Sequence, residues 1–148
     1  MRGLVLFISM VVATSALSQK FVEDFMDKLQ EVGEKCSEEV GATDDDIAAL
    51  IAHTIPESHT GKCLVFCFNK AFHLQKEDGS SDLKGSMQSL EPLKADDKEM
   101  YDKVLKIFIT CGTKVKQDPD PCITAANMGQ CAADEGKAMG LSADVFEI

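Results

Sequence analysis

The cysteines are the residues of this chain whose chemistry depends most on their spacing. Cys63 and Cys67 lie four residues apart in the stretch GKCLVFCFNKAFHL, and the chain also contains Cys36, Cys111, Cys122 and Cys131. As thiolates, such residues could bind a metal ion or act as nucleophiles, whereas in an oxidising compartment they form crosslinks. The compartment of the protein therefore decides which chemistry is open to them.

The N-terminus has the features of a secretory signal peptide. A positively charged start precedes the uncharged apolar run GLVLFISMVVA, which is too short to span a bilayer comfortably. The small residues Ala16 and Ser18 occupy the positions that signal peptidase inspects if it cuts before Gln19. We therefore expect a signal peptide over residues 1–18 and a secreted, extracellular domain over residues 19–148, without a segment that inserts into a membrane.

Six cysteines in a short secreted chain predict three disulfides. If helical, Cys63 and Cys67 lie one turn apart with nearly parallel side chains, and Cys122 and Cys131 lie on opposite sides of one helix. Neither pair can then bridge to itself without strain. The other connectivities stay open at this point, and each of them joins helices that are distant in the sequence.

Charge and periodicity restrict the fold and its partners. The net charge of −10 at pH 7, without a basic stripe, argues against binding to nucleic acid or to anionic membranes. Apolar residues recur at helical spacing along most of the chain, and strand patterns are almost absent. The pattern predicts an all-α, disulfide-stapled domain of six helices, at residues 20–40, 43–53, 60–76, 83–93, 95–116 and 121–140.

The cysteine intervals point to a known family. The pattern Cys36-x26-Cys63-x3-Cys67-x43-Cys111-x10-Cys122-x8-Cys131, on helices after a signal peptide, resembles that of the insect pheromone and general odorant-binding proteins. The x3 and x8 intervals are the specific features, whereas the x43 interval is long, which we attribute to extra residues in the turn at 77–86. The resemblance covers essentially the whole mature chain, and it implies disulfides that join Cys36 to Cys67, Cys63 to Cys122, and Cys111 to Cys131.

The resemblance also implies an internal apolar cavity that carries small hydrophobic ligands, odorants or pheromones, through aqueous fluid. Helical faces rich in Phe and Met suit a pocket that accepts many ligands, although without the cysteine pattern they would be interpreted as an ordinary packed core. A polar group such as Tyr101 or Asn127 could orient the ligand. The residues predicted to line the cavity are Phe25, Leu29, Phe68, Met87, Leu90, Val104, Phe108, Met128 and Phe146.

Other chemistries fit the sequence less well. Cys63 and Cys67 near His59 or His73 could suggest zinc, but oxidised cysteines do not ligate a metal. A small secreted phospholipase needs a calcium loop and a His-Asp pair beside adjacent cysteines, and neither Cys-Cys nor His-Asp occurs in the chain. No G-x-S-x-G motif is present either. We therefore expect no enzymatic activity, no cofactor and no metal ion.

The expected protein is a monomeric or weakly dimeric carrier, whose partners are a small hydrophobic ligand and a membrane odorant receptor. Its C-terminal tail, residues 141–148, alternates apolar and acidic side chains, and we hypothesise that it folds over the mouth of the cavity. Two alternatives stay open. One is an extracellular carrier or scavenger of lipids or amines outside olfaction, and the other is a disulfide-stapled interaction or defence protein without a cavity.

Overall fold

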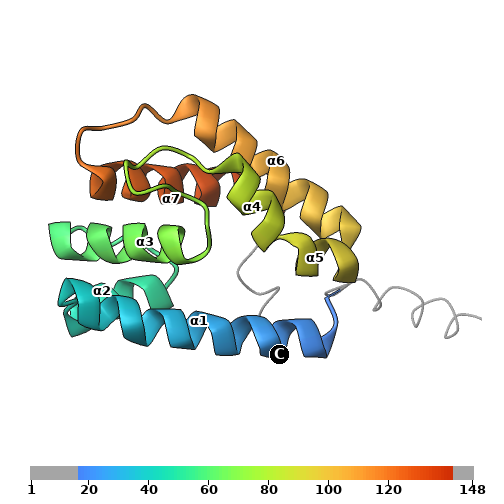
Figure 1. The fold of residues 1–148 in the computed structure, drawn as a ribbon, viewed down its shortest axis with the longest axis horizontal. Helices are drawn as coiled ribbons and strands as arrows, with labels where there is room; N and C mark the ends of the chain where they lie inside the picture. Colours follow the sequence, from blue (N-terminus) through green and yellow to red (C-terminus); the bar gives the residue numbers. More distant parts are fainter. Residues whose placement is uncertain (1–16, 142–148) are drawn as a thin grey trace, which may run out of the picture.

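The structure is a computed structural model that describes residues 17–141, in which there are seven helices and one isolated β-bridge (Figure 1). The all-α fold class is confirmed, with one helix more than expected. Most of the predicted signal peptide and the tail residues 142–148, including Phe146, lie outside the described residues. The helices are α1 (Gln19–Val40), α2 (Asp44–Ile51), α3 (His59–Ala71), α4 (Leu83–Ser89), α5 (Glu91–Asp96), α6 (Lys98–Lys114) and α7 (Pro121–Ala138).

The segment expected as one helix over residues 83–93 forms two helices instead. α4 ends at Ser89, and α5 starts at Glu91 with Pro92 in its first turn. Proline has no N–H group, and inside a helix its ring collides with the preceding turn, but it is accommodated in a first turn. The chain therefore ends one helix and begins another at this proline.

Helix α3 ends earlier than the periodicity indicates. It stops at Ala71, and His73 then adopts a left-handed backbone conformation with a φ of 56°. The buried side chain of Gln75 holds the loop that follows, because its Nε2 donates to the carbonyl oxygens of Gly79, at 2.8 Å, and of Pro121, at 3.4 Å. A hydrogen bond thereby holds the loop after α3 against the start of α7.

The corner between α2 and α3 is fixed by hydrogen bonds at the two helix starts. The buried carboxylate of Asp46 accepts from the backbone N–H of Thr43 at 3.0 Å and from the hydroxyl of Ser58, whose oxygen accepts from the N–H of Gly61. The hydrogen bond from Ser58, followed by those from Thr43, lowers the pKa of Asp46 below its ordinary value. Gly61 has no room for a side chain, since a Cβ atom there would lie 2.3 Å from the Cβ of Pro56.

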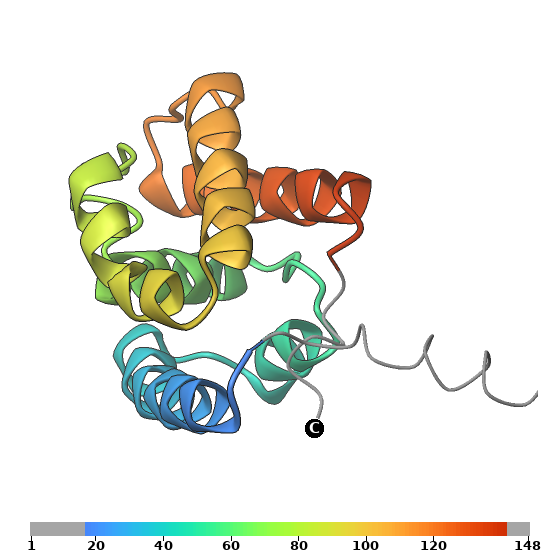
Figure 2. The ribbon, with the colours of Figure 1, turned by 90° about the vertical axis from the view of Figure 1, so that its right-hand side faces the viewer.

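Helix α3 is the central element of the packing. It packs against α1, α2 and α7, while α6 packs against α4, α5 and α7. The view in Figure 2 shows α1 and α2 on one side of α3, and α6 and α7 on the other. At its other end α1 contacts α5. None of the described helices has the length and apolarity needed to cross a membrane.

Twelve of the sixteen buried apolar side chains within residues 17–141 form three clusters, and the partly buried Leu50 packs against both the second and the third. The first lies between the start of α1, α5 and α6, the second between α1 and α3, and the third between α3 and α7. A small domain usually has one contiguous core. The region between these clusters is therefore where an incompletely packed interior is expected.

Candidate ligand-binding site

Three disulfides link four of the helices. They join Cys36 of α1 to Cys67 of α3, Cys63 of α3 to Cys122 of α7, and Cys111 of α6 to Cys131 of α7. These are the pairs that the family resemblance implies, and no cysteine of the chain is free. The two cysteines one turn apart on α3 therefore have partners on two different helices.

Three of the predicted lining residues lie outside all three clusters and are partly buried. Phe25 and Leu29 are on α1, and Phe108 is on α6. Phe25 meets the ring of Phe21 at a centroid distance of 6.2 Å, nearly parallel to it, and that of Phe72 at 6.1 Å. Large apolar side chains that are neither exposed nor fully packed are suited to contact a bound apolar molecule.

Three further predicted residues lie at the borders of the clusters. Leu90 and Val104 pack against the first cluster, and Phe68 packs against the second, and all three are partly buried. Phe68 also lies close to α1, because a Cβ atom at Gly33 would be 3.4 Å from its ring. Leu90 and Val104 thus border the cluster of α1, α5 and α6, and Phe68 borders the cluster of α1 and α3.

The remaining predicted residues are placed differently. Met128 on α7 is buried, with 7 % of its surface exposed, whereas Met87 on α4 is 42 % exposed. Phe146 lies outside the described residues. Membership of all nine predicted residues in a cavity lining stays a prediction.

Sequence reasoning did not select Phe21 and Phe72, which flank Phe25 in the structure. Phe21 lies on the same face of α1 as Phe25, four residues earlier, so the helical spacing in the sequence indicates that the two rings are neighbours. Phe72 is the C-cap residue of α3, and its contact with α1 depends on how the two helices are placed. No local pattern in the sequence indicates that contact.

The two polar residues proposed to orient a ligand have opposite environments. Tyr101 on α6 is buried, with 4 % of its surface exposed, and it belongs to the first cluster, against which Leu90 and Val104 pack. The ammonium group of Lys94 lies 5.4 Å from the centre of its ring. Asn127 is exposed on α7. Tyr101 is therefore the better placed of the two for contact with an interior ligand.

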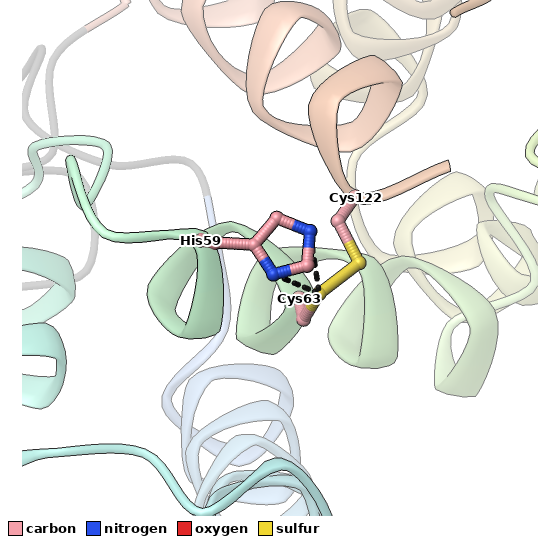
Figure 3. A group of neighbouring side chains, drawn as sticks. All are labelled: His59, Cys63 and Cys122. Atoms are coloured by element: carbon pink, nitrogen blue, oxygen red, sulfur yellow. Dashed lines mark hydrogen bonds between the residues drawn. A yellow bond between two sulfur atoms is a disulfide. The ribbon is translucent and has the colours of Figure 1, made fainter. Parts of the chain in front are cut away.

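Figure 3 shows the one group of potential metal ligands found among the described residues, His59, Cys63 and Cys122. The ring nitrogens of His59 lie 3.8 and 3.9 Å from the sulfur of Cys63, but both sulfurs belong to a disulfide and offer no thiolate. His59 instead pairs with the carboxylate of Asp120, the N-cap residue of α7, at 2.7 Å. That contact, followed by the N–H of Cys122, lowers the pKa of Asp120.

A surface groove of about 390 Å³ between α1 and α3 has a different character from the apolar region. Its rim carries three lysines and three glutamates, and none of the eight predicted lining residues that the structure describes contributes to it. Such a charged, open groove gives an apolar molecule little surface to contact. The groove is therefore poorly suited to hydrophobic ligands.

Comparisons with known proteins agree with this geometry. The chain is 28 % identical over 129 residues to general odorant-binding protein 19d of Drosophila melanogaster, which covers 87 % of this chain and 84 % of that protein. It is 29 % identical over 138 residues to general odorant-binding protein 28a of the same species, covering 93 % and 96 % of the two chains.

Solved structures show the same fold. The structure of odorant-binding protein 28a from Drosophila melanogaster matches with a TM-score of 0.69 at 28 % identity, over 82 % of this chain and 99 % of that one. A pheromone-binding protein of the cockroach Leucophaea maderae, in complex with 1-anilinonaphthalene-8-sulfonic acid, matches with a TM-score of 0.60 at 23 % identity, over 79 % and 97 %. The sequence pattern of the PBP/GOBP family matches residues 18–135, and the chain belongs to that family.

Proposed function

We propose that this protein is a secreted carrier that reversibly binds small hydrophobic molecules, odorants or pheromones, between its helices and transports them through aqueous fluid. The observation that carries this proposal is the division of the core. Phe25, Leu29 and Phe108 stand outside the three buried clusters and are only partly buried. A bound apolar molecule would complete the burial of these side chains and would gain about 25 cal/mol for each Å² of apolar surface removed from water.

The crosslinks support a carrier rather than a folding-on-binding module. Disulfides connect α1, α3, α7 and α6 in series, so these helices keep their arrangement when no ligand fills the interior. A preformed apolar site reduces the entropy lost on binding. Reversible binding requires such a site, because the fold must survive both loading and release.

The sequence supports export to an oxidising fluid. The N-terminal leader and the complete pairing of the cysteines fit a secreted, extracellular protein. Membership of a family of odorant-binding carriers fits a protein without catalytic activity. The proposal includes a monomeric or weakly dimeric state and delivery of the ligand to a membrane odorant receptor.

The test is a fluorescence titration of the oxidised, delipidated mature protein. The probe is 1-anilinonaphthalene-8-sulfonic acid, the reporter bound to the cockroach protein, together with the neutral N-phenyl-1-naphthylamine. The chain has no Trp, so its own emission interferes little. We expect saturable binding in the micromolar range, displaced by volatile alcohols, esters or fatty acids and abolished by reduction of the disulfides.

Two neighbouring residues of α6 form a matched pair for locating the site. Phe108 is partly buried, whereas Ile109 is 49 % exposed. Phe108→Ala should weaken probe binding about tenfold, because it removes an aromatic contact surface, and Ile109→Ala should leave it unchanged. Leu64→Ala, at a residue with 1 % exposure, serves as the control for lost stability without a lost contact.

Tyr101 offers a test of ligand orientation. Replacing it by Phe keeps the buried ring and removes only the hydroxyl, its sole hydrogen-bonding group. We expect Tyr101→Phe to weaken binding of alcohols several-fold, and binding of hydrocarbons of the same length to stay as in the parent protein. Equal effects on both ligand classes would remove Tyr101 from the site.

The outcome also separates the alternatives. A correctly bridged protein with no saturable probe binding would have a packed interior, and the disulfide-stapled interaction or defence protein would then be the better description. Saturable binding combined with expression outside olfactory tissue would favour the carrier or scavenger of lipids or amines.

A further inference from the structure

The structure bears on where the leader is removed. Three cuts satisfy the requirement for small residues at the last and third-last positions before the scissile bond, and one of them, after Ser15, uses Ser15 and Ala13 and keeps Leu17 and Ser18 in the mature chain as a cut after Ala16 does. A cut after Ser18 uses Ser18 and Ala16, and a cut after Ala16 uses Ala16 and Thr14. We propose that the cut falls after Ala16, so that the mature chain begins at Leu17, two residues before the boundary that the sequence pattern predicts. This inference rests on the proposed secretion and is independent of ligand binding.

Leu17 is part of the folded core. Only 7 % of its surface is exposed, and it forms the first cluster together with Val22 of α1, Leu93 of α5 and Tyr101 of α6. Tyr101 and Leu93 reach their own burial of 4 % and 7 % with Leu17 in place. Removing Leu17 would uncover apolar surface at this end of the domain, which costs free energy in water.

Ser18 makes specific polar contacts that a leader residue does not need. It is the N-cap of α1, and its hydroxyl oxygen accepts from the N–H of Phe21 at 3.1 Å. Its own N–H donates to the carboxylate of Asp96 at 2.8 Å, and its hydroxyl donates to the other oxygen of the same group. Ser18 therefore ties the first turn of α1 to Asp96, the last residue of α5.

The N-termini left by cuts after Ser18 and after Ala16 differ in their electrostatics. A cut after Ser18 would place the new ammonium group on Gln19, the first residue of α1, where the helix dipole disfavours a positive charge. The same cut would remove both donors that Ser18 gives to Asp96. A cut after Ala16 places the ammonium on Leu17, adjacent to the N–H that already contacts this carboxylate, and opposite charges so close attract.

The retained residues also close one end of the proposed ligand region. Leu90 and Val104, two of the predicted lining residues, pack against the cluster that contains Leu17. An N-terminus at Leu17 thus keeps the wall formed by α5 and α6 in contact with the start of α1. An N-terminus at Gln19 would leave that contact to Phe21 and Val22 alone.

The direct test is expression of the complete precursor, with its own leader, in insect cells. The secreted protein is analysed by N-terminal sequencing and by intact mass, since the products of the cuts after Ala16 and after Ser18 differ by one leucine and one serine residue. We expect the sequence LSQKF at the N-terminus. A protein that begins at Gln19, with a free or a cyclised glutamine, would overturn the proposal, whereas retention of the unprocessed precursor in the cells would overturn the proposed secretion instead.

The structural reason is tested separately with two oxidised, refolded chains, residues 17–148 and 19–148. The shorter chain should unfold at a midpoint lower by about 5–10 °C, because it lacks the cap and the buried leucine. Asp96→Ala should lower the midpoint of the longer chain but hardly change that of the shorter one, since Ser18 supplies the contacts. Gln19→Ala, at an exposed residue, is the matched control and should shift neither midpoint by more than about 1 °C. Equal midpoints for the two parent chains would contradict this reasoning.

Discussion

Two glycines should respond in opposite directions to the same substitution by alanine. Gly61 in α3 and Gly136 in α7 are both helical and both buried. Alanine is favoured over glycine inside a helix by up to about 1 kcal/mol. At Gly136 the added methyl group would lie 3.8 Å from the Cδ1 atom of Ile107, an ordinary contact, so Gly136→Ala should stabilise the protein by about 0.5–1 kcal/mol.

At Gly61 the same methyl group has no space. It would lie 2.3 Å from the Cβ atom of Pro56 and 2.6 Å from a carboxylate oxygen of Asp46. The proline ring is stiff, and Asp46 is held by Thr43 and Ser58, so relief requires a shift of the whole corner between α2 and α3. Overpacking of this kind costs about 1–3 kcal/mol, which exceeds the gain in helix propensity. We expect Gly61→Ala to destabilise the protein by about 1–2 kcal/mol.

The assay is urea unfolding of the oxidised protein followed by far-UV circular dichroism. With a common slope, the change in midpoint concentration gives the change in unfolding free energy. In the Pro56→Gly background, which removes the colliding ring, Gly61→Ala should cost clearly less than it does alone, and this coupling identifies the contact. The reasoning is refuted if Gly61→Ala is neutral or stabilising, or if Gly136→Ala destabilises as much as Gly61→Ala.

Three further outcomes follow from contacts described above. The lowered pKa values of Asp46 and Asp120 mean that their ionised forms stabilise the fold above the ordinary carboxyl pKa of 3.8, and this stabilisation is lost as the pH falls through the lowered values. The thermal midpoint should therefore not fall between pH 7 and 5 and should decrease below about pH 4, as scanning calorimetry can measure. Replacing Cys63 and Cys122 by alanine removes the disulfide between α3 and α7, which spans 59 residues, and should lower the free energy of unfolding by about 4 kcal/mol. The same change at Cys111 and Cys131, which span 20 residues between α6 and α7, should lower it by about 3 kcal/mol. Gln75→Ala should cost about 1–3 kcal/mol in denaturant titrations, since it leaves the carbonyl oxygen of the buried Gly79 without this donor.

Local sequence features predict the helices well where the structure depends on local interactions. Thr43 and the acidic residues after it mark the start of α2, and Pro121 marks the start of α7. The predicted end of α3 was wrong, because the segment after Ala71 forms a loop that the side chain of Gln75 holds. Gln75 donates to carbonyl oxygens of Gly79 and Pro121, which only the folded chain brings near. Pro92 indicates a helix boundary in the sequence, but the residue lies in the first turn of α5 and does not end the preceding helix.

The candidate site is predictable to a lesser degree. Helical spacing identifies the apolar faces that carry Phe25, Leu29 and Phe108, because periodicity reports which side of a helix is buried. It does not report how completely each side chain is buried, since that depends on how far apart the helices lie. The exposure of Met87 and the contact of Phe72 with Phe25 are therefore properties of helix placement.

The path of the disulfides also has a mechanical meaning. They connect α1 to α3, α3 to α7 and α7 to α6, and none of them reaches α2, α4 or α5. α2 is held instead at the start of α3 by the hydrogen bonds of Asp46 and Ser58. If the ligand binds between the helices as proposed, its entry or exit displaces part of the surrounding wall, and moving a disulfide-linked helix strains the helix to which it is linked. Within the described residues, the pair α4–α5, whose two helices meet at Leu90, has no disulfide and contacts α1 through the hydrogen bonds between Ser18 and Asp96; we call this pair the panel. We expect this panel to set the rate of ligand exchange, with the fastest amide hydrogen exchange among the helices that border the apolar region.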